Sequence, residues 1–220
     1  MLITKFGHSC LLIEESGLHI LFDPGSYSTL QNDVERVDVI LITHEHQDHL
    51  HIESLQKILS RNPEAKIFTN SGVGEKLRET NIAYELFEHK QTITLKGVLI
   101  EGFGTDHAQI YNTIPIIPNT GYFINNRFFY PGDALNIPDR PVEILAYPAV
   151  APWMKLADAL DYGKAVHPNV AFPVHDGFLK SPGAYYRYAE SELTAAGIQW
   201  VVIEEGKSAE LLRSDISLNL

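Results

Sequence analysis

The chain has 220 residues, of which 45% are hydrophobic and 20% are charged, and its formal net charge is −11 at pH 7. This length predicts one domain over residues 1–220, and the acidic charge argues against an extended nucleic-acid surface, which would need many Lys and Arg side chains to neutralise phosphates. No apolar run approaches the roughly 18 residues of a membrane span, and residues 1–6 lack the pattern of a signal peptide, so we expect a cytoplasmic protein without a membrane partner.

Short β-strands open the chain. Apolar and β-branched residues predict strands at 3–6, 9–14 and 19–22. The third strand ends at the turn sequence Asp23-Pro24-Gly25, and a polar, loop-like segment follows at 26–36. The single cysteine, Cys10, cannot form an internal disulfide and lies in an apolar strand, so we expect a buried packing residue.

A dense histidine motif follows the fourth predicted strand, at 37–42. Residues 43–50 read Thr-His-Glu-His-Gln-Asp-His-Leu. Residues two apart on an extended segment point to the same side, so His44 and His46 can reach one cation, while Asp48 and His49 can face a second cation beside it. Two metals about 3.5 to 4 Å apart would hold and activate a bridging water. The alternative is a polar loop that is merely rich in histidine.

Helices and strands alternate through the rest of the chain. Helical spacing predicts helices at 52–61, 74–79, 156–163 and 185–193. Strands are predicted at 65–69, within 84–103, and at 121–124, 127–130, 142–147, 169–174, 199–203 and 209–212. Asn125-Asn126 is a two-residue hairpin turn, and 108–119 is expected to form a loop over the site. Two packed sheets covered by helices on the outside fit this order.

Three further candidate ligands stand where predicted strands end. They are His107, Asp133 and His175, each with a glycine within three residues that lets the backbone approach a ligand closely. A lone histidine after a strand is more often a packing residue than a ligand. The set as a whole, added to the motif at 43–50, therefore indicates a metal site.

The spacing His44-x-His46-x-Asp48-His49, followed by His107, Asp133 and His175, resembles the metallo-β-lactamase superfamily over nearly the whole chain. The resemblance implies an α+β fold, a four-layer αββα sandwich of two mixed β-sheets with helices outside, and a dinuclear metal centre. It also implies that His44, His46 and His107 hold one metal, that Asp48, His49 and His175 hold the other, and that Asp133 bridges them.

A narrower resemblance concerns residues 6–10, Phe-Gly-His-Ser-Cys, and the Asp23-Pro24 turn. These are similar to the small lactonase-like and phosphodiesterase-like branch, which includes ascorbate-6-phosphate lactonase. The Gly-Asp-Thr usual around the bridging aspartate is Gly132-Asp133-Ala134 here. That departure leaves the substrate branch open while the ligands themselves are intact.

The predicted activity is a metal-dependent hydrolase in which a metal-bridging hydroxide cleaves an ester, lactone or phosphodiester bond. Five imidazoles and two carboxylates without a thiolate suit two divalent ions, zinc before manganese, iron or nickel. Zinc lowers the pKa of bound water to about 7, and Asp48 is expected to orient the nucleophile as a catalytic residue. Two cations, two carboxylates and one hydroxide leave about +1 at the centre, which favours a small anionic substrate.

Several residues are candidates for a lesser role. His8 could contact the substrate or a ligand, and Asp106 and Asp176 could accept an imidazole N–H from the adjoining ligand histidines. Each has a plain alternative, a structural polar role for His8 and a solvated loop carboxylate for the two aspartates. Trp153 is predicted to pack in the core or a lid.

Two other functions stay open. One is a mononuclear-iron oxidoreductase of the persulfide dioxygenase type on the same fold. Diiron relatives carry His-x-Glu-x-Asp, and His46 stands here in place of that Glu. The other is a non-catalytic binding protein, which would be expected to have lost ligands, and all seven are present.

Overall fold

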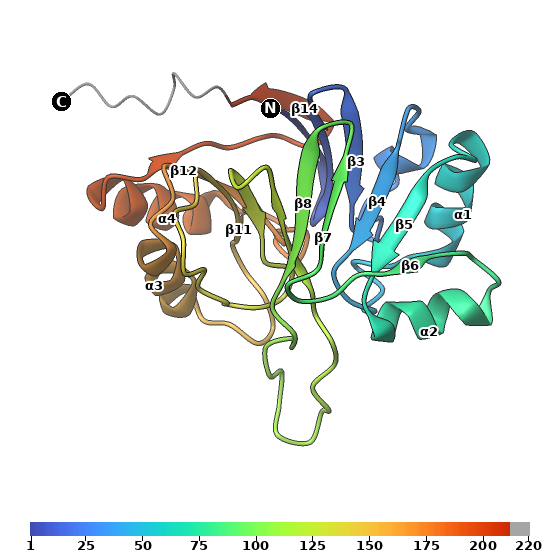
Figure 1. Cartoon of the computed structure of the whole chain (residues 1–220). Coiled ribbons are helices and arrows are strands. Elements are labelled where there is room, and N and C mark those ends of the chain that lie inside the picture. Colours follow the sequence, from blue (N-terminus) through green and yellow to red (C-terminus); the bar gives the residue numbers. More distant parts are fainter. Residues whose placement is uncertain (212–220) are drawn as a thin grey trace.

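Two seven-stranded β-sheets pack face to face, with helices on their outer faces, in the computed structural model, which describes residues 1–211 (Figure 1). The helices α1 (Ile52–Arg61) and α2 (Ser71–Glu79) cover one sheet, and α3 (Leu156–Val166) and α4 (Gly183–Ala195) cover the other. The predicted αββα sandwich of two mixed sheets is confirmed.

The first sheet has the order β14-β1-β2-β3-β4-β5-β6 and is parallel only from β3 to β6. Its strands are β1 (Leu2–Gly7), β2 (Cys10–Glu15), β3 (Leu18–Phe22), β4 (Val39–Ile42), β5 (Lys66–Thr69), β6 (Glu85–Leu86) and β14 (Lys207–Glu210). The segment predicted as a loop at 26–36 contains a short 3-10 helix, η1 (Leu30–Asp33). The last predicted strand, 209–212, begins two residues earlier, and residue 212 lies outside the described part of the chain.

The second sheet has the order β13-β12-β11-β10-β9-β8-β7, antiparallel from β7 to β10 and parallel beyond. Its strands are β7 (Thr92–Leu95), β8 (Val98–Phe103), β9 (Gly121–Ile124), β10 (Phe128–Tyr130), β11 (Ile144–Pro148), β12 (Val170–Val174) and β13 (Gln199–Trp200). The predicted hairpin turn is confirmed, since Asn125 and Asn126 both have positive φ, 52° and 53°, as a type I′ turn requires.

The two faces of strand β4 pack against two different cores, which explains why its sequence is a continuous apolar run. Val39 and Leu41 face the core between the sheets, whereas Ile40 and Ile42 face the core under α1 and α2. A strand covered on both sides needs apolar residues at every position. Cys10 is buried in the same outer core, as expected.

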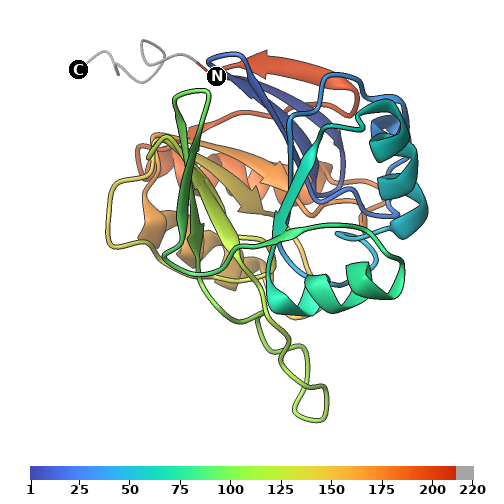
Figure 2. The ribbon, with the colours of Figure 1, turned by 45° about the vertical axis from the view of Figure 1, so that its right-hand side comes forward.

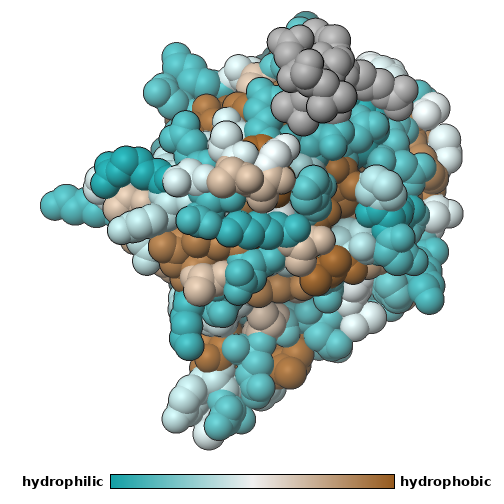
Figure 3. All heavy atoms as spheres, turned by 90° about the vertical axis from the view of Figure 1, so that its left-hand side faces the viewer, coloured by the Kyte–Doolittle hydropathy of each residue, from teal (hydrophilic) through white to brown (hydrophobic). Residues whose placement is uncertain are grey.

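The segment between β8 and β9 extends past the sheets as an arm (Figures 1 and 2). Tyr111, Ile114 and Ile116 are exposed along it. Viewed from the side of α3 and α4, apolar patches interrupt a largely hydrophilic surface (Figure 3). Within residues 1–211 we find no helix that combines the length and the apolar character needed to cross a bilayer.

Candidate metal centre

The predicted ligands come from four chain segments that meet at one end of the sandwich. Residues 43–50 follow β4 directly, His107 follows β8, Asp133 follows β10 and His175 follows β12. The carboxyl ends of parallel strands lie at one edge of a sheet, so side chains placed after them converge. All seven predicted ligands are buried or partly buried there.

Three overlapping groups of ligand atoms occupy this end. In each group the ligand atoms lie within 4.8 Å of one another. The groups are His44, His46 and His107; His44, His49 and Asp133; and His8, Asp48, His49 and His175. The structure therefore brings together every predicted ligand and adds His8 beside them.

Asp133 stands at the middle of the cluster. Its Oδ2 atom lies 3.0 Å from Nε2 of His175 and 3.4 Å from Nε2 of His107, and its Oδ1 atom lies 3.2 Å from Nε2 of His49. Its side chain is 4% exposed, which leaves little water to solvate the charge. This central position is the one that the resemblance assigns to a bridging ligand.

Four of the histidines direct Nδ1 at an oxygen away from the centre. Because those oxygens accept the Nδ1 proton, Nε2 is left with its lone pair facing inward. The pairs are His44 with Thr43 Oγ1 (3.0 Å), His49 with Asp23 Oδ2 (2.7 Å), His107 with the Ala108 carbonyl (2.5 Å) and His175 with the Val150 carbonyl (2.7 Å).

These inward Nε2 atoms are buried and have no hydrogen-bond partner within the described residues, and neither has Oδ1 of Asp133. Lone pairs that face a carboxylate at 3.0 to 3.5 Å repel it unless a cation or a proton lies between them. Imidazole nitrogens and carboxylate oxygens are also the ligands that zinc prefers. The residues present thus fit a metal centre.

The pKa values show how strongly this cluster favours positive charge. Burial lowers the pKa of His175, but the carboxylates of Asp133 and Asp48 outweigh it and raise that pKa to about 9. Burial likewise opposes the charge of Asp133, yet His175 and His49 hold its pKa well below the usual range. Protons and metal ions therefore compete for the same Nε2 atoms.

Asp23 orients two of the ligand histidines through hydrogen bonds. The position of Asp23 in a turn sequence did not reveal this role. The carboxylate is fully buried and accepts four hydrogen bonds. The donors are Thr43 N (2.8 Å), Thr43 Oγ1 (2.8 Å), His49 Nδ1 (2.7 Å) and Tyr130 Oη (2.6 Å). Since Thr43 Oγ1 donates to Asp23, that hydroxyl must accept from His44, and one carboxylate thereby fixes two ligand rings.

Gly25 lets this turn pack against the metal motif. A Cβ atom at Gly25 would lie 1.8 Å from the carbonyl oxygen of Asp48. Ser26 N also donates to the Gln47 carbonyl at 2.8 Å. The turn after β3 and the loop after β4 are therefore locked together by close backbone contact.

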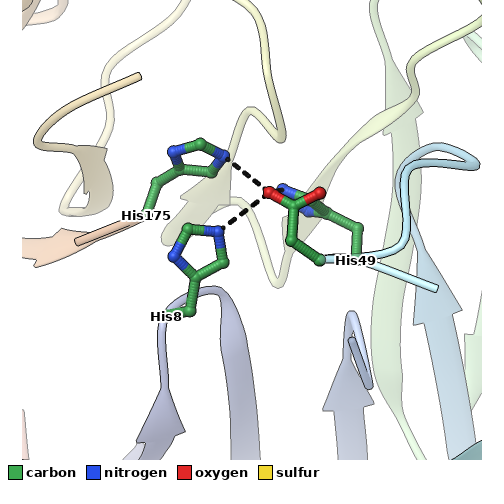
Figure 4. A group of neighbouring side chains, drawn as sticks. His8, His49 and His175 are labelled. Carbon is green, nitrogen blue, oxygen red and sulfur yellow. Dashed lines mark hydrogen bonds and ion pairs between the residues drawn. The ribbon is translucent and has the colours of Figure 1, made fainter. Parts of the chain in front are cut away.

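His8 lies in the cluster as a hydrogen-bond donor (Figure 4). Its Nδ1 accepts from the backbone N–H of Gly177 at 3.0 Å, so its proton is on Nε2, which lies 3.1 Å from Oδ2 of Asp48. Burial lowers the pKa of His8 to about 4, which keeps the ring neutral at pH 7. The backbone at Gly177 does approach another group closely, as predicted, but that group is the His8 ring and not a bound ligand.

The two aspartates beside ligand histidines do not accept an imidazole N–H. Asp106 is exposed and accepts from Thr105 Oγ1 at 2.8 Å. Asp176 is buried and pairs with Lys5 Nζ at 2.5 Å and with the hydroxyl of Tyr186. Backbone carbonyls hold the two rings instead, that of the next residue, Ala108, for His107 and that of Val150, in the loop after β11, for His175.

Trp153 has a polar contact that the packing prediction missed. Its Nε1 donates to Oδ2 of Asp133 at 3.1 Å, and its ring lies 5.9 Å from that of His107. The only sequence signal was an indole in a loop near the predicted site. An indole N–H that is partly buried usually finds an acceptor.

The chain matches the profile of a family described as Beta-lactamase superfamily domain over residues 2–175. Among curated proteins it is 38% identical to Protein Rv0786c of Mycobacterium tuberculosis, over 84% of this chain and 90% of that one. It is 26% identical to the UPF0173 metal-dependent hydrolase MJ1163 of Methanocaldococcus jannaschii, over 96% of this chain and all of that one (100%).

Among solved structures the chain resembles Igni18, a metallo hydrolase of Ignicoccus hospitalis, with a TM-score of 0.72. The match covers 96% of this chain and 99% of the other at 21% identity. At this identity the likeness concerns the fold alone, and it agrees with the two-sheet architecture described above.

Proposed function

The chain belongs to the beta-lactamase superfamily, and from that premise we propose that it is a metal-dependent hydrolase that uses two divalent cations to cleave an ester, lactone or phosphodiester bond. Its substrate is a small molecule whose scissile bond lies next to the cations. Any anionic group of the substrate adjoins that bond and also faces the cations. The narrower resemblance to the lactonase-like and phosphodiesterase-like branch stays a prediction.

One observation carries this proposal. Four buried Nε2 atoms, each with its Nδ1 proton directed elsewhere, surround the carboxylate of Asp133 and have no hydrogen-bond partner among the described residues. Leaving so many buried polar atoms unpaired would be costly in a site without a ligand. Cations held by these atoms remove that cost, which is why we favour a metal site over a merely histidine-rich loop.

We assign His44, His46 and His107 to one cation and Asp48, His49 and His175 to the other, with Asp133 between them. This nitrogen-rich set without thiolate favours zinc. His8 is not included, because its Nε2 carries a proton that is donated to Asp48. Bound cations would polarise the bond to be cleaved and make a water molecule nucleophilic at neutral pH.

The side chains of the protein would orient the reacting groups. Donation from His8 fixes the rotation of the Asp48 carboxylate, which lines the cavity above the cluster. There Asp48 can accept a hydrogen bond from the attacking water. This contact would orient the lone pair of the water oxygen toward the substrate. Trp153 Nε1 donates to Oδ2 of Asp133 and so fixes the rotation of that carboxylate between the rings of His107 and His175.

The test is to measure metal content and hydrolysis together. Protein loaded separately with zinc, manganese and iron is analysed for bound metal and then screened against phosphodiester, lactone and thioester substrates. We expect two ions per chain and turnover of at least one class, with both lost in Asp48→Ala and His107→Ala.

His167→Asn is the matched control, because His167 is exposed at the end of α3, away from the cluster. It should keep both metal and turnover. One bound iron per chain with oxygen consumption would favour the dioxygenase alternative. Turnover in Asp48→Ala and His107→Ala at the parent rate would contradict the mechanism.

A further inference from the structure

A cavity of about 240 Å³ opens over the candidate metal centre. Half of the residues that line it are candidate ligands, and the others form its rim. The rim residues are Gln47, Ile110, Pro152, Trp153 and Phe178. Four of these five are apolar, and they come from the arm after β8, the loop after β11 and the loop after β12.

Two rim rings stand directly beside ligand rings. The ring of Trp153 lies 5.9 Å from that of His107, and Phe178 lies 5.3 Å from His175. Phe178 is 41% exposed and packs against Tyr27, whose ring is 5.1 Å away and which is 42% exposed. Aromatic surface kept open to water beside a reactive centre is available to contact a ligand.

The rim offers no positive charge. None of the described residues that line the cavity is a lysine or an arginine. The nearby cation Lys5 is buried and already held by Asp176 and by the Pro173 carbonyl at 2.9 Å. A phosphate or carboxylate at the far end of a substrate would therefore lie mainly on apolar side chains, with the neutral Gln47 amide beside them and no cationic side chain to offset its lost hydration.

We infer that the part of the substrate that extends beyond the cations is uncharged and apolar, about the size of one ring. This inference rests on the proposed function, because it describes the substrate of that same site. It confines any anionic group of the substrate to the cluster itself. It disfavours substrates with a second, distant phosphate.

Three hydroxamates that differ only in their tails test the inference without requiring turnover. Acetohydroxamate, benzohydroxamate and the monohydroxamate of succinic acid share one metal-binding group and carry a methyl, a phenyl and a carboxylate tail. Their dissociation constants are measured by calorimetry on the zinc-loaded protein. We expect benzohydroxamate to bind at least about tenfold more tightly than acetohydroxamate, and the succinic acid derivative to bind no more tightly than acetohydroxamate.

Phe178→Ala should reduce the phenyl preference to about threefold or less while the zinc content stays unchanged. Ile137→Ala is the matched control, since Ile137 is 56% exposed and does not line the cavity. It should leave the preference intact. The ratio of the two dissociation constants is compared between each variant and the parent protein. This comparison cancels any difference in the intrinsic zinc affinity of the probes.

Equal binding of the phenyl and methyl probes by zinc-loaded protein, or tightest binding of the carboxylate probe, would overturn the inference and leave the metal centre standing. A phenyl preference that is unchanged in Phe178→Ala would also overturn the assignment to this rim. Failure of the protein to take up zinc would instead overturn the proposed function, and the inference would fall with it.

Discussion

The two sheets supply the candidate metal centre in opposite ways. The first sheet places four ligands within six consecutive residues after β4, and its neighbouring turn adds the Asp23 carboxylate that holds them. The second sheet supplies His107, Asp133 and His175 from three separate strand ends, together with all four apolar residues of the rim. One half of the site is thus fixed by local chain geometry, and the other half depends on the register of a whole sheet.

This difference gives the two sheets different roles in the site. The motif after β4 has little freedom to vary, because backbone contacts at Gly25 lock it in place. The loops of the second sheet carry both single ligands and rim residues, so changes there alter the surroundings of the substrate. Substitutions in one half of the site should therefore show how far it depends on the other half.

Asp133→Ala should have the largest effect, because this single residue of the second sheet contacts His49 of the first and His107 and His175 of its own. We expect metal affinity to fall by more than about a hundredfold, beyond the usual loss for residues that only orient ligands. Hydrolysis should be lost as well.

Thermal unfolding provides a second measurement of this variant. A ligand that binds only the folded protein raises its stability, so chelation should lower the melting temperature of the parent. The same treatment should leave Asp133→Ala unchanged. A zinc-dependent melting temperature in the variant would show that the first sheet can hold metal without the second.

Asp23→Asn tests the support within the first sheet. The amide keeps one acceptor oxygen in place of two, so in either orientation its NH2 group faces a group that already donates to Asp23, which weakens the anchor of both ligand rings. We expect a loss of about ten- to a hundredfold in metal affinity, measured by competition with a chelator. Tyr130→Phe removes only one of the four donors and should cost much less.

His8→Gln sharpens the distinction between ligands and donors. His8 comes from the first sheet but is oriented by Gly177 of the second. We expect unchanged zinc content and about tenfold slower turnover, because Asp48 loses the donor that fixes it. His49→Gln, by comparison, should lose metal. Loss of zinc from His8→Gln would show that His8 is itself a ligand.

Trp153→Phe should have the smallest effect. It keeps an aromatic ring on the rim and removes only the N–H that donates to Asp133. A hydrogen bond from a neutral donor to a carboxylate is worth about 1.5 kcal/mol, which corresponds to about a tenfold loss of metal affinity. Binding of benzohydroxamate, measured at saturating zinc, should be unaffected. A larger loss of metal would mean that the indole also positions the second-sheet ligands.

Most elements and the types of the candidate ligands can be predicted from the sequence. The apolar run of β4, the Asn125-Asn126 turn and the helical spacing of α1 each reflect local physics, and each was predicted close to its observed bounds. The motif at 43–50 was equally readable, because the side chains of adjacent residues must lie near one another. The strand predicted at 199–203 is confirmed only as the two residues of β13, and the 3-10 helix η1 lies in a segment predicted as a loop, since tertiary contacts and not residue type decide such ends.

How the candidate ligands are held depends on contacts between distant parts of the chain. The acceptors for His107 and His175 are backbone carbonyls, which every residue possesses and which therefore leave no mark in the sequence. The proton position on His8 depends on a contact with a residue 169 positions away. Asp23 and Trp153 gained their roles in the same way, because partners brought together by folding, and not neighbours in the chain, fix the orientation of a buried polar group.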